Sequence, residues 1–243
     1  MGKLKCSRVI NMQTMPSMCD EDSYMTLPAI LDMFQDIAGM HADTVGIGAL
    51  EMEEKGLFWV LSRIKLRVIS RPFIYDSLDV TTWIQPAERA TCERDFSMAL
   101  DGEIKAYARS IWAALRRDNG RPAPMAEFYP DADFCMAPPD DEPFARRSKR
   151  FDDAETIGEY RVRSIDIDRG GHMNNVNYVR AMLGCFTREE IKEMDIRELD
   201  IHFVRQCYEG DTIRFVKRPS EDSLMEVAAV NEEGTVCFMA AIN

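Results

Sequence analysis

The sequence predicts an α+β protein made of two similar halves, each an antiparallel sheet with one long helix. Two observations predict this class. An amphipathic helical pattern followed by strand-like segments occurs twice, in the same order. The two copies also align at a nearly constant offset, which indicates a duplicated domain rather than a short solenoid repeat.

The composition is that of a globular protein. The chain has 243 residues, of which 46% are hydrophobic and 30% are charged, so it can bury a core. Its longest apolar runs fall far short of the roughly 18 residues that cross a bilayer. Its start, MGKLKCSRVI, lacks the apolar stretch of a secretory signal. We therefore expect a cytoplasmic protein with no membrane partner.

The formal net charge of −12 argues against nucleic-acid binding, which needs a basic surface to neutralise phosphates. An acidic partner would need a local basic patch, and RRSKR at residues 146–150 is the dense candidate. Such a run is also typical of a solvated linker. The 7 cysteines include no C-x-x-C pair, so we expect reduced, packed thiols rather than a disulfide frame or a zinc site.

The first helix is predicted from Pro28 to about Gly46, because apolar residues recur there at three- and four-residue intervals. Its apolar face comprises Ile30, Leu31, Phe34, Ile37, Ala38, His41 and Val45. Segments rich in β-branched and aromatic residues follow and predict four strands. These strands cover residues 57–70, 77–85, 91–100 and 103–115, with Asp101-Gly102 as a hairpin turn.

The second half shows the same order. A helix is predicted from about Asn174, with Val176, Val179, Leu183 and Phe186 on one face. Its strands cover residues 198–206, 211–218, 223–230 and 235–242. Asp76 falls on Asp211 (211 − 76 = 135), and beyond one shorter loop Gly102 falls on Gly234 (234 − 102 = 132).

The duplication predicts three parts of the chain. They are a first domain at residues 1–118, a linker at 119–156 that is rich in proline and charge, and a second domain at 157–243. In each domain the helix can bury its apolar face against one sheet face. The two domains could pack as a pseudo-twofold pair, much as a homodimer would, so a monomer and a further homodimer both stay open.

A sheet wrapped around a central helix, duplicated in one chain, resembles the hotdog fold in its double form. FWVLSRIKLRV and ARSIWAAL in the first half, with DIDRGGHMNNVNYV and VRQCYEGD in the second, are similar to acyl carrier protein (ACP) thioesterases of plants and bacteria. The likeness runs from about Val9 to the end. It implies that the first hotdog houses the acyl chain and that the second carries the chemistry. The implied reaction releases free fatty acid and holo-ACP in fatty acid biosynthesis, within lipid metabolism.

The family motif is an acid, an asparagine two residues on, a histidine two further, then a hydrophobic residue and two asparagines. Here Gly170 stands where the family has the first asparagine, and Gln206 stands where it commonly has a glutamate, next to Cys207. The resemblance thus implies the catalytic residues Asp168, His172 and Gln206, and the substrate-binding residues Gly170, Asn174 and Asn175. Trp59 and His41 are added as substrate-binding candidates from their own positions in the first half.

The residues themselves suit thioester hydrolysis. Asp168 could deprotonate a water or attack directly. Backbone N–H groups at the helix start near Asn174 could stabilise an oxyanion, and Gly170 would let a ligand approach the backbone. His172 could donate to the carbonyl or orient the acid. The alternative is a simple turn closed by Asp168 and the glycines, with Asn174 or Asn175 as the helix cap.

The remaining candidates have structural interpretations beside functional ones. His41 could be a hydrogen-bonded core histidine or line the acyl slot, and Trp59 could line that slot or belong to the core. Cys207 is interpreted as packing rather than as a nucleophile. The 3 histidines lack ligand-like spacing and no phosphate loop occurs, so no metal and no cofactor are expected.

Two other functions stay open: hydrolysis of acyl coenzyme A, and noncatalytic acyl binding, since hotdog folds host several functions. If the acidic carrier protein is the partner, the patch that docks it would be Arg146, Arg147, Lys149 and Arg150.

Overall fold

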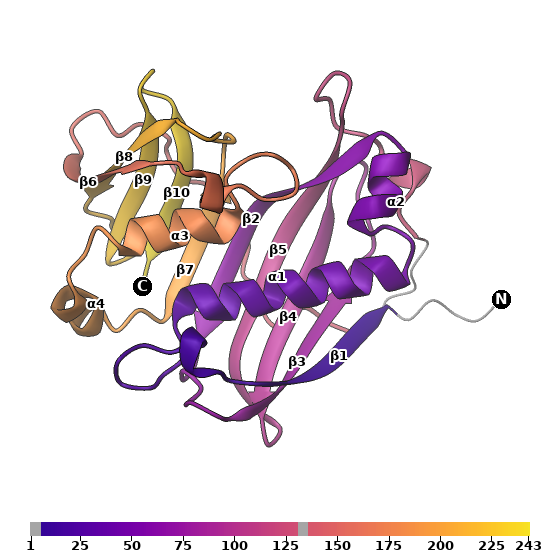
Figure 1. Ribbon diagram of the computed structural model, residues 1–243, viewed down its shortest axis with the longest axis horizontal. Coiled ribbons are helices and arrows are strands. Elements are labelled where there is room, and N and C mark those ends of the chain that lie inside the picture. Colours follow the sequence, from indigo (N-terminus) through magenta and orange to yellow (C-terminus); the bar gives the residue numbers. More distant parts are fainter. Residues whose placement is uncertain (1–5, 131–135) are drawn as a thin grey trace. The chain divides into compact units, whose positions relative to one another are not determined.

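The structure is a computed structural model that describes residues 6–130 and 136–243. It divides into two compact units, unit 1 (residues 1–62 and 66–142) and unit 2 (residues 63–65 and 143–243). Each unit consists of an antiparallel sheet and one principal helix, which confirms the predicted α+β class (Figure 1).

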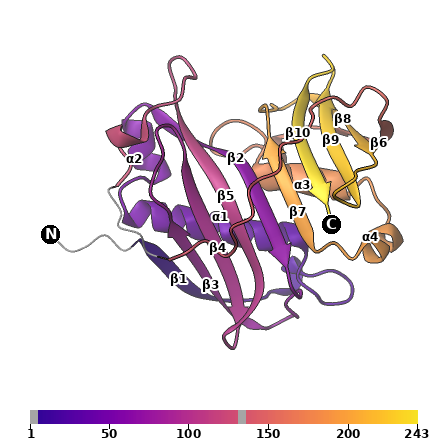
Figure 2. The same cartoon turned by 180° about the vertical axis from the view of Figure 1, so that it is seen from behind.

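Unit 1 follows the predicted order with one strand added in front and one short helix added between the predicted helix and the four strands. Its elements are β1 (Ser7–Gln13), α1 (Leu27–Thr44), α2 (Ala49–Glu54), β2 (Leu57–Val68), β3 (Ser77–Ile84), β4 (Cys92–Leu100) and β5 (Glu103–Arg116), with short 3-10 turns at Pro16–Met18 and Met125–Glu127. The strands lie in the order β1-β3-β4-β5-β2. Helix α1 runs along one face of this sheet, and Figure 2 shows the sheet from the opposite side.

Helix α1 forms where its pattern predicts. The Thr26 side chain caps it by accepting a hydrogen bond from the Ala29 N–H at 3.3 Å, and Pro28 occupies the first turn. Its inner face is buried, and the ring of Phe34 stacks on Phe96 of β4 with centroids 5.0 Å apart. The helix is therefore held by its apolar face against the sheet.

Unit 2 repeats this plan. Its elements are β6 (Glu155–Arg161), a 3-10 turn at Ser164–Asp166, α3 (Asn175–Leu183), α4 (Arg188–Met194), β7 (Glu198–Phe203), β8 (Thr212–Arg218), β9 (Met225–Asn231) and β10 (Val236–Ile242). The strand order is β7-β10-β9-β8-β6. Tyr178 of α3 stacks on Phe238 of β10 at 5.6 Å, which seats the helix on the inner face of the sheet.

The duplication is visible in individual hydrogen bonds. In unit 1 the Asp76 carboxylate accepts from the Phe73 N–H at 2.8 Å, and in unit 2 the Asp211 carboxylate accepts from the Tyr208 N–H at the same distance. These turns precede β3 and β8, so the offset of 135 aligns equivalent turns. The hairpin at Asp101 is also confirmed, since its φ and that of Gly102 are both positive, 51° and 83°.

Three features differ from the sequence predictions. The edge strands β1 and β6 and the short helices α2 and α4 were not predicted, and β6 begins at Glu155, within the segment predicted as linker. Cys6 is disulfide-bonded, contrary to the expected reduced thiols. The other described cysteines are free: Cys19, Cys92, Cys185, Cys207 and Cys237. Among the described residues, no helix is both long and apolar enough to cross a bilayer.

Candidate active site

The polar stretch ahead of α3 forms a closed loop. The Asp168 N–H donates to the His172 carbonyl at 3.0 Å, and the Gly171 N–H donates to the Asp168 carbonyl at 3.0 Å. Gly171 has a φ of +81°, which a residue with a side chain rarely adopts. A bridge between Ile167 and Met173 closes the loop at its base. The loop therefore delivers both Asp168 and His172 to the start of the helix.

The Asp168 carboxylate is partly exposed, with 27% of its side chain accessible. Its Oδ1 accepts a hydrogen bond from the Gly170 N–H at 2.7 Å, and its Oδ2 lies 3.6 Å from His172 Nδ1. The described residues offer this carboxylate no guanidinium or ammonium within ion-pair distance. It is a carboxyl group that water can reach, held in place by one backbone hydrogen bond.

The imidazole of His172 is folded over Gly170. A Cβ at position 170 would lie 2.7 Å from His172 Nε2 and 3.0 Å from Asp168 Oδ1, closer than real contacts allow. The family asparagine that Gly170 replaces would therefore displace this ring. His172 Nε2 is buried, and no atom of the described residues hydrogen-bonds to it. A buried polar atom of this kind calls for a ligand or water partner.

The start of α3 settles the choice between the two candidate caps. Asn174 is the cap, because its Oδ1 accepts from the Val176 N–H at 2.8 Å. The Asn174 N–H in turn donates to the Asp166 carbonyl at 2.8 Å. Asn175 is the first helical residue, and its N–H has no acceptor among the described residues. This N–H is the donor that the helix start leaves for a ligand oxygen.

Gln206 lies beside the loop because its neighbour is bonded to it. The Cys207 carbonyl accepts from the Met173 N–H at 2.8 Å, which fixes this stretch against the base of the loop. The Gln206 side chain accepts from the Tyr208 hydroxyl at 3.3 Å. Cys207 is 1% exposed and its N–H donates to Tyr178 Oη at 2.9 Å, so it is a packed residue.

The other two predicted substrate-binding residues belong to unit 1. His41 is fully buried on α1, and its Nδ1 lies 2.9 Å from Arg94 Nη1. Trp59 donates to the Ile47 carbonyl at 2.8 Å and packs against three partly buried aromatic rings. Those rings are Trp112, Phe128 and Tyr129. The predicted site residues are thus shared between the units, with the chemistry-bearing ones in unit 2.

Sequence reasoning missed Arg94, a buried cation on β4. Its burial lowers the pKa of the guanidinium, and Arg94 Nη1 also donates to Thr82 Oγ1 at 3.2 Å. Strand alternation could have found it, because Arg94 shares a strand face with the apolar Cys92, Phe96 and Met98.

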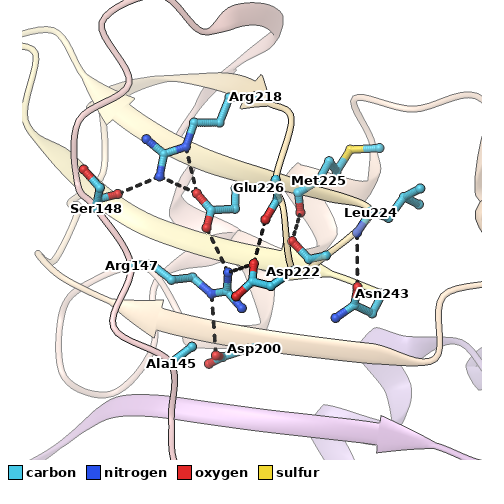
Figure 3. A network of polar contacts seen from close by, with 12 residues as sticks. Ala145, Arg147, Ser148, Asp200, Arg218, Asp222, Leu224, Met225, Glu226 and Asn243 are labelled. Carbon is cyan, nitrogen blue, oxygen red and sulfur yellow. Dashed lines mark hydrogen bonds and ion pairs between the residues drawn. The ribbon is translucent and has the colours of Figure 1, made fainter.

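The basic run at residues 146–150 is only partly a surface patch. Arg147 turns inward in unit 2, where its Nη1 donates to Glu226 at 2.9 Å and to Asp222 at 3.0 Å (Figure 3). Its Nε also lies 3.7 Å from the buried Asp200, and only 10% of its side chain is exposed. The inclusion of Arg147 in a docking patch is therefore wrong, because the network in Figure 3 already occupies its guanidinium.

The other basic residues of this run, Arg146, Lys149 and Arg150, are exposed. In the described part of the chain, no group of three or more His, Cys, Asp and Glu residues is arranged as a metal site.

The fold and the loop define a class: a tandem double hotdog protein with an acid and a histidine just ahead of α3, the principal helix of unit 2. Family comparison then identifies the chain itself. The acyl-ACP thioesterase N-terminal domain matches residues 9–131, and the acyl-ACP thioesterase C-terminal domain matches residues 149–242. The chain belongs to the acyl-ACP thioesterase family.

Relatives and solved structures agree with this assignment. Oleoyl-acyl carrier protein thioesterase 2 of Arabidopsis thaliana is 24% identical over 206 residues, which cover 77% of this chain and 56% of that protein. The chain thus spans little more than half the length of this relative. Two solved structures share the fold at 22% identity: an acyl-ACP thioesterase from Bacteroides thetaiotaomicron (TM-score 0.83, covering 100% and 99% of the two chains) and the 12:0-ACP thioesterase from Umbellularia californica (0.86, covering 100% and 98%).

Proposed function

We propose that this chain hydrolyses the thioester of an acyl-ACP, releasing a free fatty acid and holo-ACP. The observation that carries the proposal is the Asp168 carboxylate, which water can reach and which, within the described ranges, is bonded only by the Gly170 N–H and, at longer range, by the His172 ring. Family membership supports the acyl-ACP substrate. An acid in this setting can serve as a base or as a nucleophile.

The reaction needs two functions from the loop. In the water route, Asp168 accepts a proton from a water whose oxygen adds to the acyl carbonyl. The resulting oxyanion receives hydrogen bonds from the Asn175 N–H and from His172 Nε2, two groups at the loop and helix start that have no protein partner among the described residues. Collapse breaks the C–S bond, and the departing thiolate takes the proton back from Asp168.

Direct attack by Asp168 is the second route. The carboxylate oxygen would add to the carbonyl and expel the thiolate, leaving a mixed anhydride that water then hydrolyses. Mass spectrometry of a rapidly quenched reaction in H₂¹⁸O distinguishes the routes. An acyl adduct on Asp168 in the quenched protein, or ¹⁸O in the Asp168 carboxylate after water attacks its Cγ, identifies the direct route. Hydrolysis of the anhydride at the substrate carbon labels only the fatty acid, as the water route does.

Substitution of Asp168 tests the proposal. Asp168→Asn should lower kcat by about 10²–10⁴-fold, the range that a positioned acid or base supplies, with the fold intact. Asp20→Asn is the matched control, because Asp20 accepts an equivalent backbone bond in unit 1. A folded Asp168→Asn protein with full turnover would refute the assignment.

A second set of measurements separates the three candidate functions. Turnover assays on acyl-ACP and acyl coenzyme A over a range of chain lengths distinguish an ACP hydrolase from a coenzyme A hydrolase. Native mass spectrometry for bound lipid, together with these assays, identifies an acyl-binding protein.

We further infer that the acidic carrier docks on Arg146, Lys149 and Arg150, the exposed cations of the basic run. Reversing the three charges to Glu should raise KM for acyl-ACP and leave acyl coenzyme A turnover nearly unchanged. Equal losses on both substrates would contradict a docking role. Reversal of Arg147 is not suitable, because that residue is bonded internally. The cytoplasmic location and the oligomeric state stay predictions.

A further inference from the structure

The loop ahead of α1 in unit 1 is a second copy of the loop that carries Asp168. The offset between them is 148, since Asp20 corresponds to Asp168 (168 − 20 = 148) and the cap Thr26 corresponds to the cap Asn174 (174 − 26 = 148). A bridge between Cys19 and Met25 closes it at its base, as a bridge closes the loop in unit 2.

The backbone bonds of the two loops match. The Asp20 N–H donates to the Tyr24 carbonyl at 2.9 Å, as Asp168 does to His172. The Ser23 N–H donates to the Asp20 carbonyl at 3.0 Å with a φ of +67°, as Gly171 does to Asp168. The two carboxylates are therefore presented by the same backbone turn.

The carboxylates also accept the same local hydrogen bond. Asp20 Oδ1 accepts from the Asp22 N–H at 3.0 Å, and Asp168 Oδ1 accepts from the Gly170 N–H at 2.7 Å. In both copies this bond orients Oδ1 toward the backbone. In both copies Oδ2 is the oxygen that can interact with a neighbouring side chain.

The segment beside each loop, which follows β2 in unit 1 and β7 in unit 2, is equivalent as well. The Met25 N–H donates to the Pro72 carbonyl at 2.8 Å, and the Met173 N–H donates to the Cys207 carbonyl at 2.8 Å. The residue just before the accepting carbonyl is Arg71 in unit 1. In unit 2 it is Gln206 (206 − 71 = 135, the offset of the paired strands).

The copies differ in what this residue does to the acid. Arg71 Nη1 forms a close ion pair with Asp20 Oδ2, and its guanidinium lies over the Tyr24 ring at 5.5 Å. Gln206 carries no charge and accepts a hydrogen bond from Tyr208, so Asp168 is not neutralised from this position. The Arg71 guanidinium occupies Asp20 Oδ2 through a charge-assisted hydrogen bond, so this oxygen is not available to accept a proton from water or to attack a carbonyl carbon.

We propose that the residue at this position, in the segment that follows β2 or β7, decides which copy of the loop supplies a reactive acid: Arg71 blocks Asp20, and Gln206 leaves Asp168 reactive. This inference rests on the proposed hydrolase function. Gln206 then acts as a positioning residue through its neutrality, and the loop of unit 1 is a structural copy that lacks both the reactive acid and the histidine.

The test is Gln206→Arg in the full chain, with Gln206→Met as the matched neutral control. We expect Gln206→Arg to lower kcat by about 10²-fold or more, in the range of acid–base catalysis, with a smaller effect on KM. Gln206→Met removes the amide without adding a charge, so its kcat is the reference with which the kcat of Gln206→Arg is compared. Because the new ion pair would be partly exposed, as that of Arg71 is, raising the salt concentration should restore part of the variant's kcat relative to wild type. A purely structural defect would not respond in this way.

Arg71→Gln gives the converse test, and it should leave turnover near the wild-type value. The inference is overturned if Gln206→Arg is as active as wild type, or if Gln206→Met loses as much activity as Gln206→Arg. A wild-type chain with no turnover on any acyl thioester refutes the proposed function and this inference together. An active wild-type chain with an unaffected Gln206→Arg variant refutes the inference alone.

Discussion

At the scale of single residues, Gly170 and Gly171 have different roles although they are adjacent. Gly170 provides the space that the His172 ring occupies, whereas Gly171 provides a positive φ in open surroundings. The first glycine therefore determines the position of a candidate catalytic group, and the second determines the shape of the loop.

Substituting each glycine by alanine should separate these roles. In Gly170→Ala the new Cβ would lie 2.7 Å from His172 Nε2, so the ring must shift and turnover should fall about 10- to 100-fold, as expected for a misplaced catalytic group. Gly171→Ala has nothing within 4 Å of its Cβ and should instead cost about 1 kcal/mol of stability. Steady-state kinetics and thermal unfolding of both variants check this. The reverse pattern, with activity lost only in Gly171→Ala, would contradict the assigned roles.

At the scale of elements, local signals predicted most of the structure. The eight strands that follow the two helices were predicted because turns and β-branched runs bound them, and Asn174 was found as one of two candidate caps because capping is a short-range property. The edge strands were missed for a physical reason. β1 alternates between half-buried and exposed residues along its whole length, so its sequence carries little of the burial signal.

The same distinction between local and long-range signals applies to the candidate site. The Asp168 loop and the cap are contiguous in sequence, so their spacing could be read directly. The pairing of Arg71 with Asp20 joins residues 51 positions apart, and the inward turn of Arg147 joins it to Glu226, 79 positions away. No local pattern encodes such contacts, because they depend on strand register and on which face of the sheet a segment crosses. The basic run was accordingly interpreted as uniform when one of its members is internal.

At the scale of the whole molecule, each unit buries a titratable group with a displaced pKa. In unit 1, burial raises the pKa of Asp95 from 3.8 to about 6, against the hydrogen bond from Gln85 and the charge of Arg109. In unit 2, burial lowers the pKa of His202 from 6.5 to about 4, and the nearby charges of Arg63 and Lys149 add to this. Both groups change protonation between about pH 4 and pH 6.5.

Their effects on stability have opposite signs. Between pH 4 and pH 6 the folded state holds the Asp95 proton more tightly than the unfolded chain, so this contribution falls as pH rises through the window. Between pH 6.5 and pH 4 the unfolded chain binds a proton at His202 that the folded state resists, so this contribution falls as pH drops. The two pH dependences of stability therefore partly cancel in the wild-type chain.

Removing either group should reveal the pH dependence that the other group gives to stability. The Tm of Asp95→Asn relative to wild type should fall as pH is lowered from 7 to 4, because wild type gains stability when Asp95 is protonated. The Tm of His202→Gln relative to wild type should rise over the same pH range. Only in wild type does the folded state disfavour a proton that the unfolded chain binds at this position. A shift of about 2–4 °C corresponds to 1 kcal/mol in a chain of this size. Thermal unfolding of the three proteins across this pH range is the measurement, and relative Tm values that stay constant with pH would show that neither group titrates as its burial implies.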